Sequence, residues 1–89
     1  MITKEILSEA TRLVGTDRQK DYGAKVENHN NIAKLWSAYL DVKIEAHDVA
    51  IMMALLKVAR TKLGAVSKDT YIDMSAYSAI AGEIKWRKK

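Results

Sequence analysis

A run of eight consecutive apolar residues, Val49 to Leu56, constrains the fold of this chain more than any other feature. Its alanines, leucines and methionines favour a helix over a strand. A helix that is apolar on every side is normally buried on every side. Eight residues are too few to cross a bilayer, which requires about 20. The run therefore predicts the central helix of a helical core, and no membrane partner.

Two cations stand at the end of this run. Lys57 and Arg60 are three residues apart and share a helix face with Met53. An unpaired charge in an apolar interior is costly, so each cation needs a partner. Either an acidic side chain or an anionic ligand meets that need, and the choice between them is the main functional question of the sequence.

Length and composition limit how this helix can be covered. The chain has 89 residues, and a domain this short buries only about 60–65% of its unfolded surface. We therefore expect a second copy to supply the missing cover in a homo-oligomer. The chain has no cysteine, which excludes disulfides and Cys-based zinc sites. Its first residues lack the apolar stretch of a secretory signal, so we predict a cytoplasmic location.

The net charge of +4 comes from the end of the chain. Lys85, Arg87, Lys88 and Lys89 account for it, because residues 1–84 hold eleven cations and eleven acids. We predict a single helical domain over 1–84 and a basic C-terminal tail over 85–89. Basic residues at a helix C-terminus favour the helix dipole and solubility. We prefer this explanation to contact with a phosphate backbone, and do not expect nucleic acid as a partner.

Apolar periodicity and capping residues predict four helices and no strand. The fold class is therefore all-α, a four-helix bundle-like domain that assembles as a homo-oligomer. The polar stretch Thr16–Gly23 is predicted as a loop, with Tyr22 as an anchor or as part of a lid over a ligand. The expected helices run from a Thr3 cap to Gly15, from about Lys25 to Leu40, from Glu45 or Asp48 to Leu63 with Gly64 as C-cap, and from a Ser67 or Asp69 cap to Ile84.

Polar residues fall where apolar ones are expected. Asn28 shares a helix face with Ile32 and is predicted to point inward, hydrogen-bonded to backbone or to a ligand. Asp69, Asp73 and Tyr77 are spaced one turn apart on the fourth helix. In a structural interpretation, these acids pair with the two cations inside the bundle. In a functional interpretation, the acids orient the cations, whose remaining donors bind phosphate while an aromatic ring stacks on a base.

Metal-dependent hydrolysis requires more carboxylates than this pattern offers. A Mg²⁺ site for a triphosphate needs several carboxylates that converge. Glu27, Asp48, Asp69 and Asp73 are spread over three helices, and His29 has no second histidine at ligand spacing. A GxxxxGK[ST] loop and a Ser-His-Asp or Cys nucleophile arrangement are missing from the sequence. The sequence predicts anion binding with no catalytic residue, metal or cofactor; only an enzymatic alternative would use these four acids to hold Mg²⁺.

Residues 16–81 resemble a family of small bacteriophage and prophage proteins with no settled function. The resemblance is carried by LLKVAR at Leu55–Arg60, by DTYIDMSAY at Asp69–Tyr77 and by the segments around Tyr22, Glu27 and Trp36. That family is distantly similar to the all-α nucleotide pyrophosphohydrolases of the MazG type, which form helical oligomers. It therefore implies a helical nucleotide pocket in a protein of the bacterial host cytoplasm.

The sequence departs from the MazG-type motifs, which are EExxE on one helix and ExxD on the next. The first is reduced to Glu27 followed by asparagines, and Thr70 replaces the glutamate of the second, although Asp73 matches its aspartate. The resemblance thus implies a nucleotide pocket without turnover. Some small phage proteins bind a host's signalling nucleotides and withhold them from defence effectors, and this sequence is compatible with that class.

We therefore predict a phage-type protein that binds a nucleotide or another phosphorylated small ligand without turnover, with sequestration of a host defence signal as one outcome. One alternative is a MazG-like metal-dependent nucleoside triphosphate pyrophosphohydrolase, which would release pyrophosphate. Another is an interaction module that occludes a host protein in a complex that survives nuclease. The predicted ligand-binding residues are Arg18, Tyr22, Asn28, Lys57, Arg60, Asp69, Asp73 and Tyr77.

Overall fold

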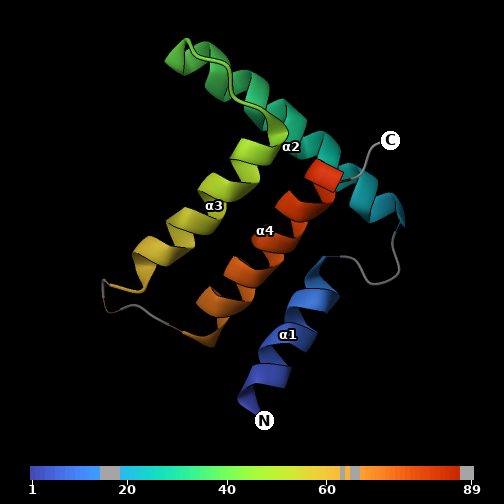
Figure 1. Cartoon of the computed structure of the whole chain (residues 1–89), viewed down its shortest axis with the longest axis vertical. Coiled ribbons are helices and arrows are strands. Elements are labelled where there is room, and N and C mark those ends of the chain that lie inside the picture. The colour runs from blue at the N-terminus through green and yellow to red at the C-terminus, as the bar shows by residue number, and fades with distance from the viewer. Residues whose placement is uncertain (15–18, 63, 65–66, 87–89) are drawn as a thin grey trace.

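The computed structural model describes the backbone of residues 1–14, 19–62, 64 and 67–86, and the side chains of these residues outside 19–24. The described residues form four helices and no strands, which confirms the all-α class (Figure 1). The helices are α1 (Ile2–Leu13), α2 (Gln19–Leu40), α3 (Ala46–Arg60) and α4 (Lys68–Trp86).

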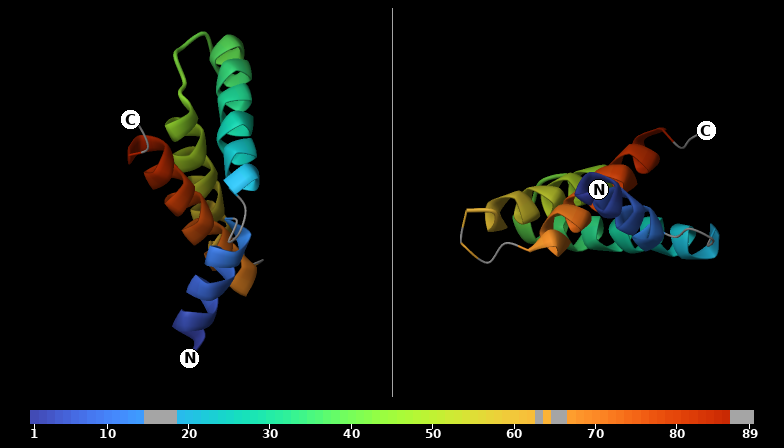
Figure 2. Two further views of the ribbon diagram at one scale, coloured as in Figure 1. Left: turned by 90° about the vertical axis from the view of Figure 1, so that its right-hand side faces the viewer. Right: turned by 90° about the horizontal axis from the view of Figure 1, so that it is seen from below.

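The helices form an open series. α3 and α4 run antiparallel side by side, α1 packs on α4, and α2 packs on α3 (Figure 1). In the left view of Figure 2, α3 lies between α4 and α2. The molecule measures 42 × 33 × 17 Å, so its shortest dimension is less than two helix diameters of about 10–12 Å. Much of the helix surface therefore has nothing packed against it within one chain.

Several predicted helix boundaries are wrong. α1 begins at Ile2, so Thr3 lies inside the helix and does not cap it. α2 begins at Gln19, so the backbone of 19–23 is helical where a loop was predicted. Gly23 was given too much weight, because a glycine inside a helix costs only about 1 kcal/mol relative to alanine, which a 22-residue helix tolerates.

α3 ends earlier than predicted because Thr61 closes it. Its backbone N–H and its hydroxyl both donate to the carbonyl of Val58, at 3.0 and 2.7 Å. These bonds satisfy a carbonyl that the helix end leaves without a partner. Gly64, with φ +83°, therefore lies beyond the helix end, and Leu63 is outside the described residues. α4 extends to Trp86, two residues into the stretch predicted as a tail.

The predicted start of α3 is confirmed. Glu45 is the N-cap residue, and its backbone N–H donates to the Asp48 carboxylate at 2.9 Å. The Glu45 side chain in turn accepts from the backbone N–H of Asp48, which completes a reciprocal capping box. Both residues named as candidate caps therefore take part in starting the helix.

The core of the single chain is small. Val49 and Ala50 of α3 are fully buried, and Ala50 packs with Ile80 and Ala81 of α4. A second cluster joins Ala10 of α1 to α4. The buried apolar residues are mostly alanines: Ala10, Ala33, Ala46, Val49, Ala50, Ile72, Ala76, Ile80 and Ala81.

Within one chain, Val49–Leu56 is not buried on every side. Leu55 is 58% exposed, and Ile51, Met52 and Leu56 are also exposed. The pattern identified an apolar helix correctly, but α4 and α2 leave its outward side bare. No helix in the described part of the chain is both long and apolar enough to span a membrane.

Candidate ligand-binding site

An ion pair joins the predicted cation cluster to α4. The Lys57 ammonium lies 3.1 Å from the Asp73 carboxylate, and the two side chains are 17% and 25% exposed. This is one of the pairings that the structural interpretation predicted. Arg60 and Asp69 are both exposed, and neither belongs to an ion pair within the described residues.

Asn28 does not point inward, contrary to prediction. It is exposed, whereas its neighbour His29 is only 6% exposed. The buried side of α2 carries His29 and Ala33, and the side with Leu35 and Tyr39 faces outward. Val26, which is half-buried, and the buried Ala33 share a face that was readable in the sequence. His29, three residues after Val26, belongs to that face.

His29 meets Tyr77 inside the molecule. Their ring centroids lie 6.3 Å apart at an interplanar angle of 54°. The Nδ1 atom of His29 is 2.8 Å from the Lys25 carbonyl, which can only accept, so Nδ1 carries the proton and donates. The buried Nε2 atom is then an acceptor, and within the described structure it has no hydrogen-bond partner.

The remaining predicted ligand residues are not gathered around one hollow. Arg18 lies outside the described residues, and for Tyr22 only the backbone is described, within α2. Tyr77 is half-buried, one turn along α4 from Asp73. The structure therefore joins Lys57 to Asp73 and Tyr77 to His29, and the predicted set as a whole remains a prediction.

The four acids of the enzymatic alternative have separate environments. Glu27 and Asp69 are exposed, Asp48 caps α3, and Asp73 pairs with Lys57. Within the ranges that the structure describes, no three His, Cys, Asp or Glu side chains lie close enough together to hold a metal ion.

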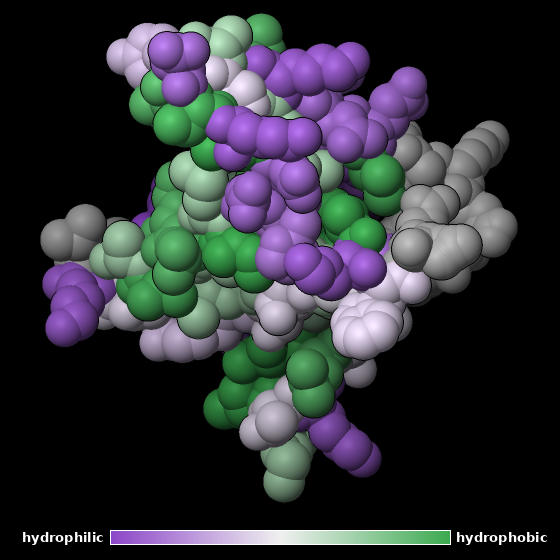
Figure 3. Space-filling model, turned by 45° about the horizontal axis from the view of Figure 1, so that its top comes forward, coloured by the Kyte–Doolittle hydropathy of each residue, from purple (hydrophilic) through white to green (hydrophobic). Residues whose placement is uncertain are grey.

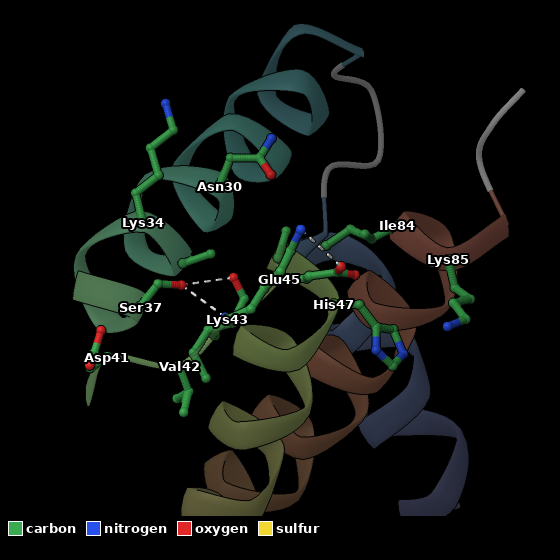
Figure 4. A pocket seen from close by; sticks show the side chains of 13 residues that line it. Asn30, Lys34, Ser37, Asp41, Val42, Lys43, Glu45, His47, Ile84 and Lys85 are labelled. Atoms are coloured by element: carbon green, nitrogen blue, oxygen red, sulfur yellow. Dashed lines mark hydrogen bonds and ion pairs between the residues drawn. The ribbon is translucent and has the colours of Figure 1, made fainter. Parts of the chain in front are cut away.

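An open cleft lies at the other end of α3, bounded by α2, the α2–α3 connection and the end of α4 (Figure 4). Its volume is about 1130 Å³. The connection is fixed to α2 by Ser37, whose hydroxyl accepts from the Ile44 N–H at 2.8 Å and donates to the Ile44 carbonyl at 3.1 Å. Asp41, with φ +58°, turns the chain out of α2 toward this connection.

Three lysines from separate segments line the cleft, Lys34 of α2, Lys43 of the connection and Lys85 of α4, and their side chains point in different directions (Figure 4). Lys43 lies 3.9 Å from the Glu45 carboxylate. Lys34 and Lys85 form no ion pair with any described residue. The lining also holds the carboxylates of Asp41 and Glu45. Its other residues are polar (Asn30, Ser37 and His47) or apolar (Ala33, Val42, Ile44, Ala46 and Ile84).

Sequence reasoning missed this cleft because no local signal marks it. Lys85 was assigned to the basic tail, and Lys34 and Lys43 fit an ordinary solvated surface. The three lysines line one cleft only because the chain reverses between α2 and α3 and α4 returns antiparallel to α3. A spacing rule within one helix cannot detect such a juxtaposition.

An ion pair on α1, away from the cleft, shifts the pKa values of both its members. Arg12 donates to Glu9 at 2.7 Å on the exposed side of α1. This hydrogen bond and the attraction of the guanidinium lower the pKa of Glu9 and raise that of Arg12. Neither residue lines the cleft, so this pair does not change its charge.

The fold and the cleft together define a small all-helical protein with a candidate anion-binding site. Residues 5–85 match the model of a family described as a domain of unknown function, DUF6378, and the chain belongs to this family. It is 40% identical over 83 residues to the Gene 55 protein of Mycobacterium phage D29, covering 93% of this chain and 55% of that protein.

The Gene 55 protein of Mycobacterium phage L5 is 41% identical over 76 residues, covering 84% of this chain and 49% of that protein. The chain thus spans about half the length of the curated relatives it matches. No solved structure matches it. The resemblance to small phage proteins of unknown function is confirmed, whereas the distant similarity to MazG-type enzymes stays a prediction.

Proposed function

We propose that this protein binds a nucleotide or another phosphorylated small ligand without turning it over, and that the ligand's phosphate occupies the cleft. The observation that carries the proposal is that Lys34, Lys43 and Lys85, from three separate segments, all line one hollow. Two of these ammonium groups, those of Lys34 and Lys85, have no carboxylate partner among the described residues.

The lining suits a ligand with one charged and one apolar part. Lysine presents a compact point charge that binds phosphate without demanding a fixed geometry. The apolar side chains beside it, such as Val42 and Ile84, offer contact area for a base or a sugar edge. Asn30 and His47 add polar groups at the rim that can form hydrogen bonds.

The end of α3 is a second candidate position, because the sequence predicted phosphate contact by Lys57 and Arg60. There the Asp73 carboxylate already neutralises Lys57 at 3.1 Å. Any phosphate would have to share the ammonium with that carboxylate or depend on the exposed Arg60. The cleft is favoured because two of its lysines are not neutralised in this way.

We prefer binding without turnover to hydrolysis because of where the four candidate metal-binding acids lie. The four carboxylates that a MazG-like pyrophosphohydrolase would use are dispersed between the cap of α3, an ion pair and two exposed positions. A triphosphatase site needs them on one metal. The proposed role is sequestration of a host defence signalling nucleotide by a self-associated phage protein in the host cytoplasm.

Calorimetry against mono-, di- and cyclic nucleotides tests the binding. The Lys34→Ala/Lys85→Ala variant should lose about a hundredfold or more in affinity, since each of the two charged hydrogen bonds contributes about 1.5–3 kcal/mol. Lys4→Ala/Lys68→Ala is the matched control, because it removes two exposed lysines that do not line the cleft. Equal affinity of the two variants would move the site away from the cleft.

Chromatography of each nucleotide after incubation with Mg²⁺ or Mn²⁺ tests the absence of turnover. We expect every nucleotide to be recovered unchanged. Steady release of pyrophosphate would instead establish the MazG-like enzyme. If no nucleotide binds and a host protein co-purifies through nuclease treatment, the protein is an interaction module.

A further inference from the structure

The outward side of α3 is an unbroken apolar surface. We call it the outer face of α3 and define it as Ile51, Met52, Leu55, Val58 and Ala59. These residues recur every three or four positions and so share one side of the helix. All five are exposed, and hydrophobic side chains gather on the α3 side of the molecule in Figure 3. No helix of the described structure covers this face.

The chain exposes more surface than a compact monomer of its mass, and the excess is large enough to form a protein–protein interface. The chain exposes 6306 Å², whereas a folded monomer of 10.0 kDa is expected to expose about 5200 Å². The difference of about 1100 Å² exceeds the roughly 800 Å² per partner of a standard protein–protein interface. The radius of gyration, 13.8 Å, is also larger than the roughly 12 Å expected for a compact domain of this length.

A second copy is the occupant that these facts favour. Val49 is the one large side chain that is fully buried in the described structure, so the fold has little core of its own. A cover on which folding depends must be present whenever the chain is made. Another copy of the same chain always meets this condition, whereas the amount of a different partner does not rise with the amount of this chain.

The charges that bracket the outer face specify its orientation. Asp48 stands in the first turn of α3, seven residues before Leu55, and Lys62 stands two residues beyond the last residue of α3, seven residues after Leu55. The two ends of the outer face therefore carry opposite charges. In an antiparallel pair centred on Leu55, each Asp48 meets Lys62 of the second copy. A parallel pair would instead place like charges together. Asp48 has an oxygen to spare for this contact, because the capping bond uses Oδ2.

We infer that α3 pairs antiparallel with α3 of a second copy, across a two-fold axis at Leu55. Such a pairing is self-complementary, as a two-fold interface requires. The inference rests on the self-association in the proposed function and is independent of the ligand. No residue of the outer face lines the cleft.

Single-cysteine variants test the axis, because the natural chain has no cysteine. Leu55→Cys should cross-link to itself with a short bismaleimide, since residue 55 meets its own copy. Met52→Cys and Val58→Cys should cross-link poorly alone, because each pair is separated by six residues, about 9 Å along the axis. Mixed together they should cross-link, since residues 52 and 58 lie opposite each other.

Tyr39→Cys is the control, at a position on α2 that is 87% exposed and outside the proposed interface. Leu55→Cys that cross-links no better than Tyr39→Cys overturns the inference. Met52→Cys that cross-links to itself as readily as Leu55→Cys indicates a parallel pair and overturns it too.

Light scattering at low micromolar concentration tests the state of the natural chain. We expect twice the 10.0 kDa chain mass and a melting temperature that rises with protein concentration. Leu55→Glu should weaken the dimer by about tenfold or more, as loss of a central interface residue does, or prevent folding. Leu35→Glu, at an exposed α2 position, should leave the dimer intact.

A folded 10.0 kDa monomer with a concentration-independent melting temperature overturns the inference, as does a host protein seated on α3 in place of the second copy. The outcomes separate this inference from the ligand proposal. A monomer that binds nucleotide refutes only the interface, and a cross-linked dimer that binds none refutes only the ligand.

Discussion

The carboxylate of Asp73 lies 3.1 Å from the ammonium of Lys57 and ties α4 to the C-terminal half of α3. Both groups are largely shielded, at 25% and 17% exposure, so water screens their attraction only in part. The pair lies on the side of α3 that faces α4, opposite the outer face. It therefore holds the helix hairpin together within one chain.

Replacement of Asp73 by alanine should destabilise the fold. The loss leaves the shielded Lys57 ammonium without its partner, and we expect a cost of about 1–3 kcal/mol, between the values for exposed and buried pairs. Urea melts at a fixed protein concentration measure it. Asp69→Ala, which removes an exposed acid from the same helix, should change stability by less than about 0.5 kcal/mol. If the two variants lose the same free energy of unfolding, the ion pair of Asp73 does not stabilise the fold.

Replacement of His29, at the contact between α2 and α4, should not destabilise the fold as replacement of Asp73 does, because its Nε2 atom has no hydrogen-bond partner in the described structure. Leucine at position 29 removes a buried acceptor that has no partner in the described structure. It also removes the bond from Nδ1 to the Lys25 carbonyl, which the helix satisfies in any case. His29→Leu should therefore leave stability unchanged or raise it by up to about 1 kcal/mol. His29→Lys, which buries a charge, should lower it by several kcal/mol. Thermal melts of the two variants that coincide would contradict this account.

Ser37 should matter for both stability and ligand binding. Its hydroxyl forms two hydrogen bonds to Ile44, and Ser37→Ala leaves the Ile44 N–H without that acceptor. We expect a loss of about 1–2 kcal/mol and weaker ligand binding, because the connection forms a wall of the cleft. Ser75→Ala is the control, since its hydroxyl bonds only to the Tyr71 carbonyl one turn earlier in α4. Unfolding in urea and nucleotide calorimetry give the two readouts.

The ion pair of α1 predicts a small pH dependence. Arg12 lowers the pKa of Glu9 by hydrogen bonding and by its charge. A lowered folded-state pKa stabilises the fold above the ordinary glutamate pKa and loses this contribution as the pH falls through the folded value. Carboxylate titration by NMR should find the pKa of Glu9 below its ordinary value, and Arg12→Gln should raise it back. Unchanged titration in Arg12→Gln would contradict the assigned cause.

Local sequence signals predicted the helices and part of the site. Glu45 and Asp48 were recognised as the start of α3, and an acid on α4 was expected to meet Lys57. Asn28 was placed inward because its face also carries Leu35 and Tyr39, yet these large apolar residues are exposed in one chain. Apolarity alone does not say whether a face meets its own chain or another.

Local sequence signals could not predict the cleft or the start of α2. Lys34 and Lys85 are 51 positions apart, and only the path of the whole chain brings them to one hollow. At the start of α2, Gly23 suggested a break, but tertiary context overrides a propensity difference of about 1 kcal/mol. The first failure concerns long-range contacts and the second concerns the weight of one residue.

The two candidate phosphate positions are separated by one conservative substitution. Arg60→Lys keeps the charge at the end of α3 but removes the bidentate fork of the guanidinium. If the phosphate lies in the cleft, this variant should bind nucleotide as the natural chain does, because Arg60 does not line the cleft. If the phosphate lies on Arg60, affinity should fall by about 1–3 kcal/mol while the fold persists. Calorimetry of Arg60→Lys beside Lys34→Ala, with thermal melts to confirm folding, decides between them. We expect the loss in Lys34→Ala, and a loss confined to Arg60→Lys would return the site to the end of α3.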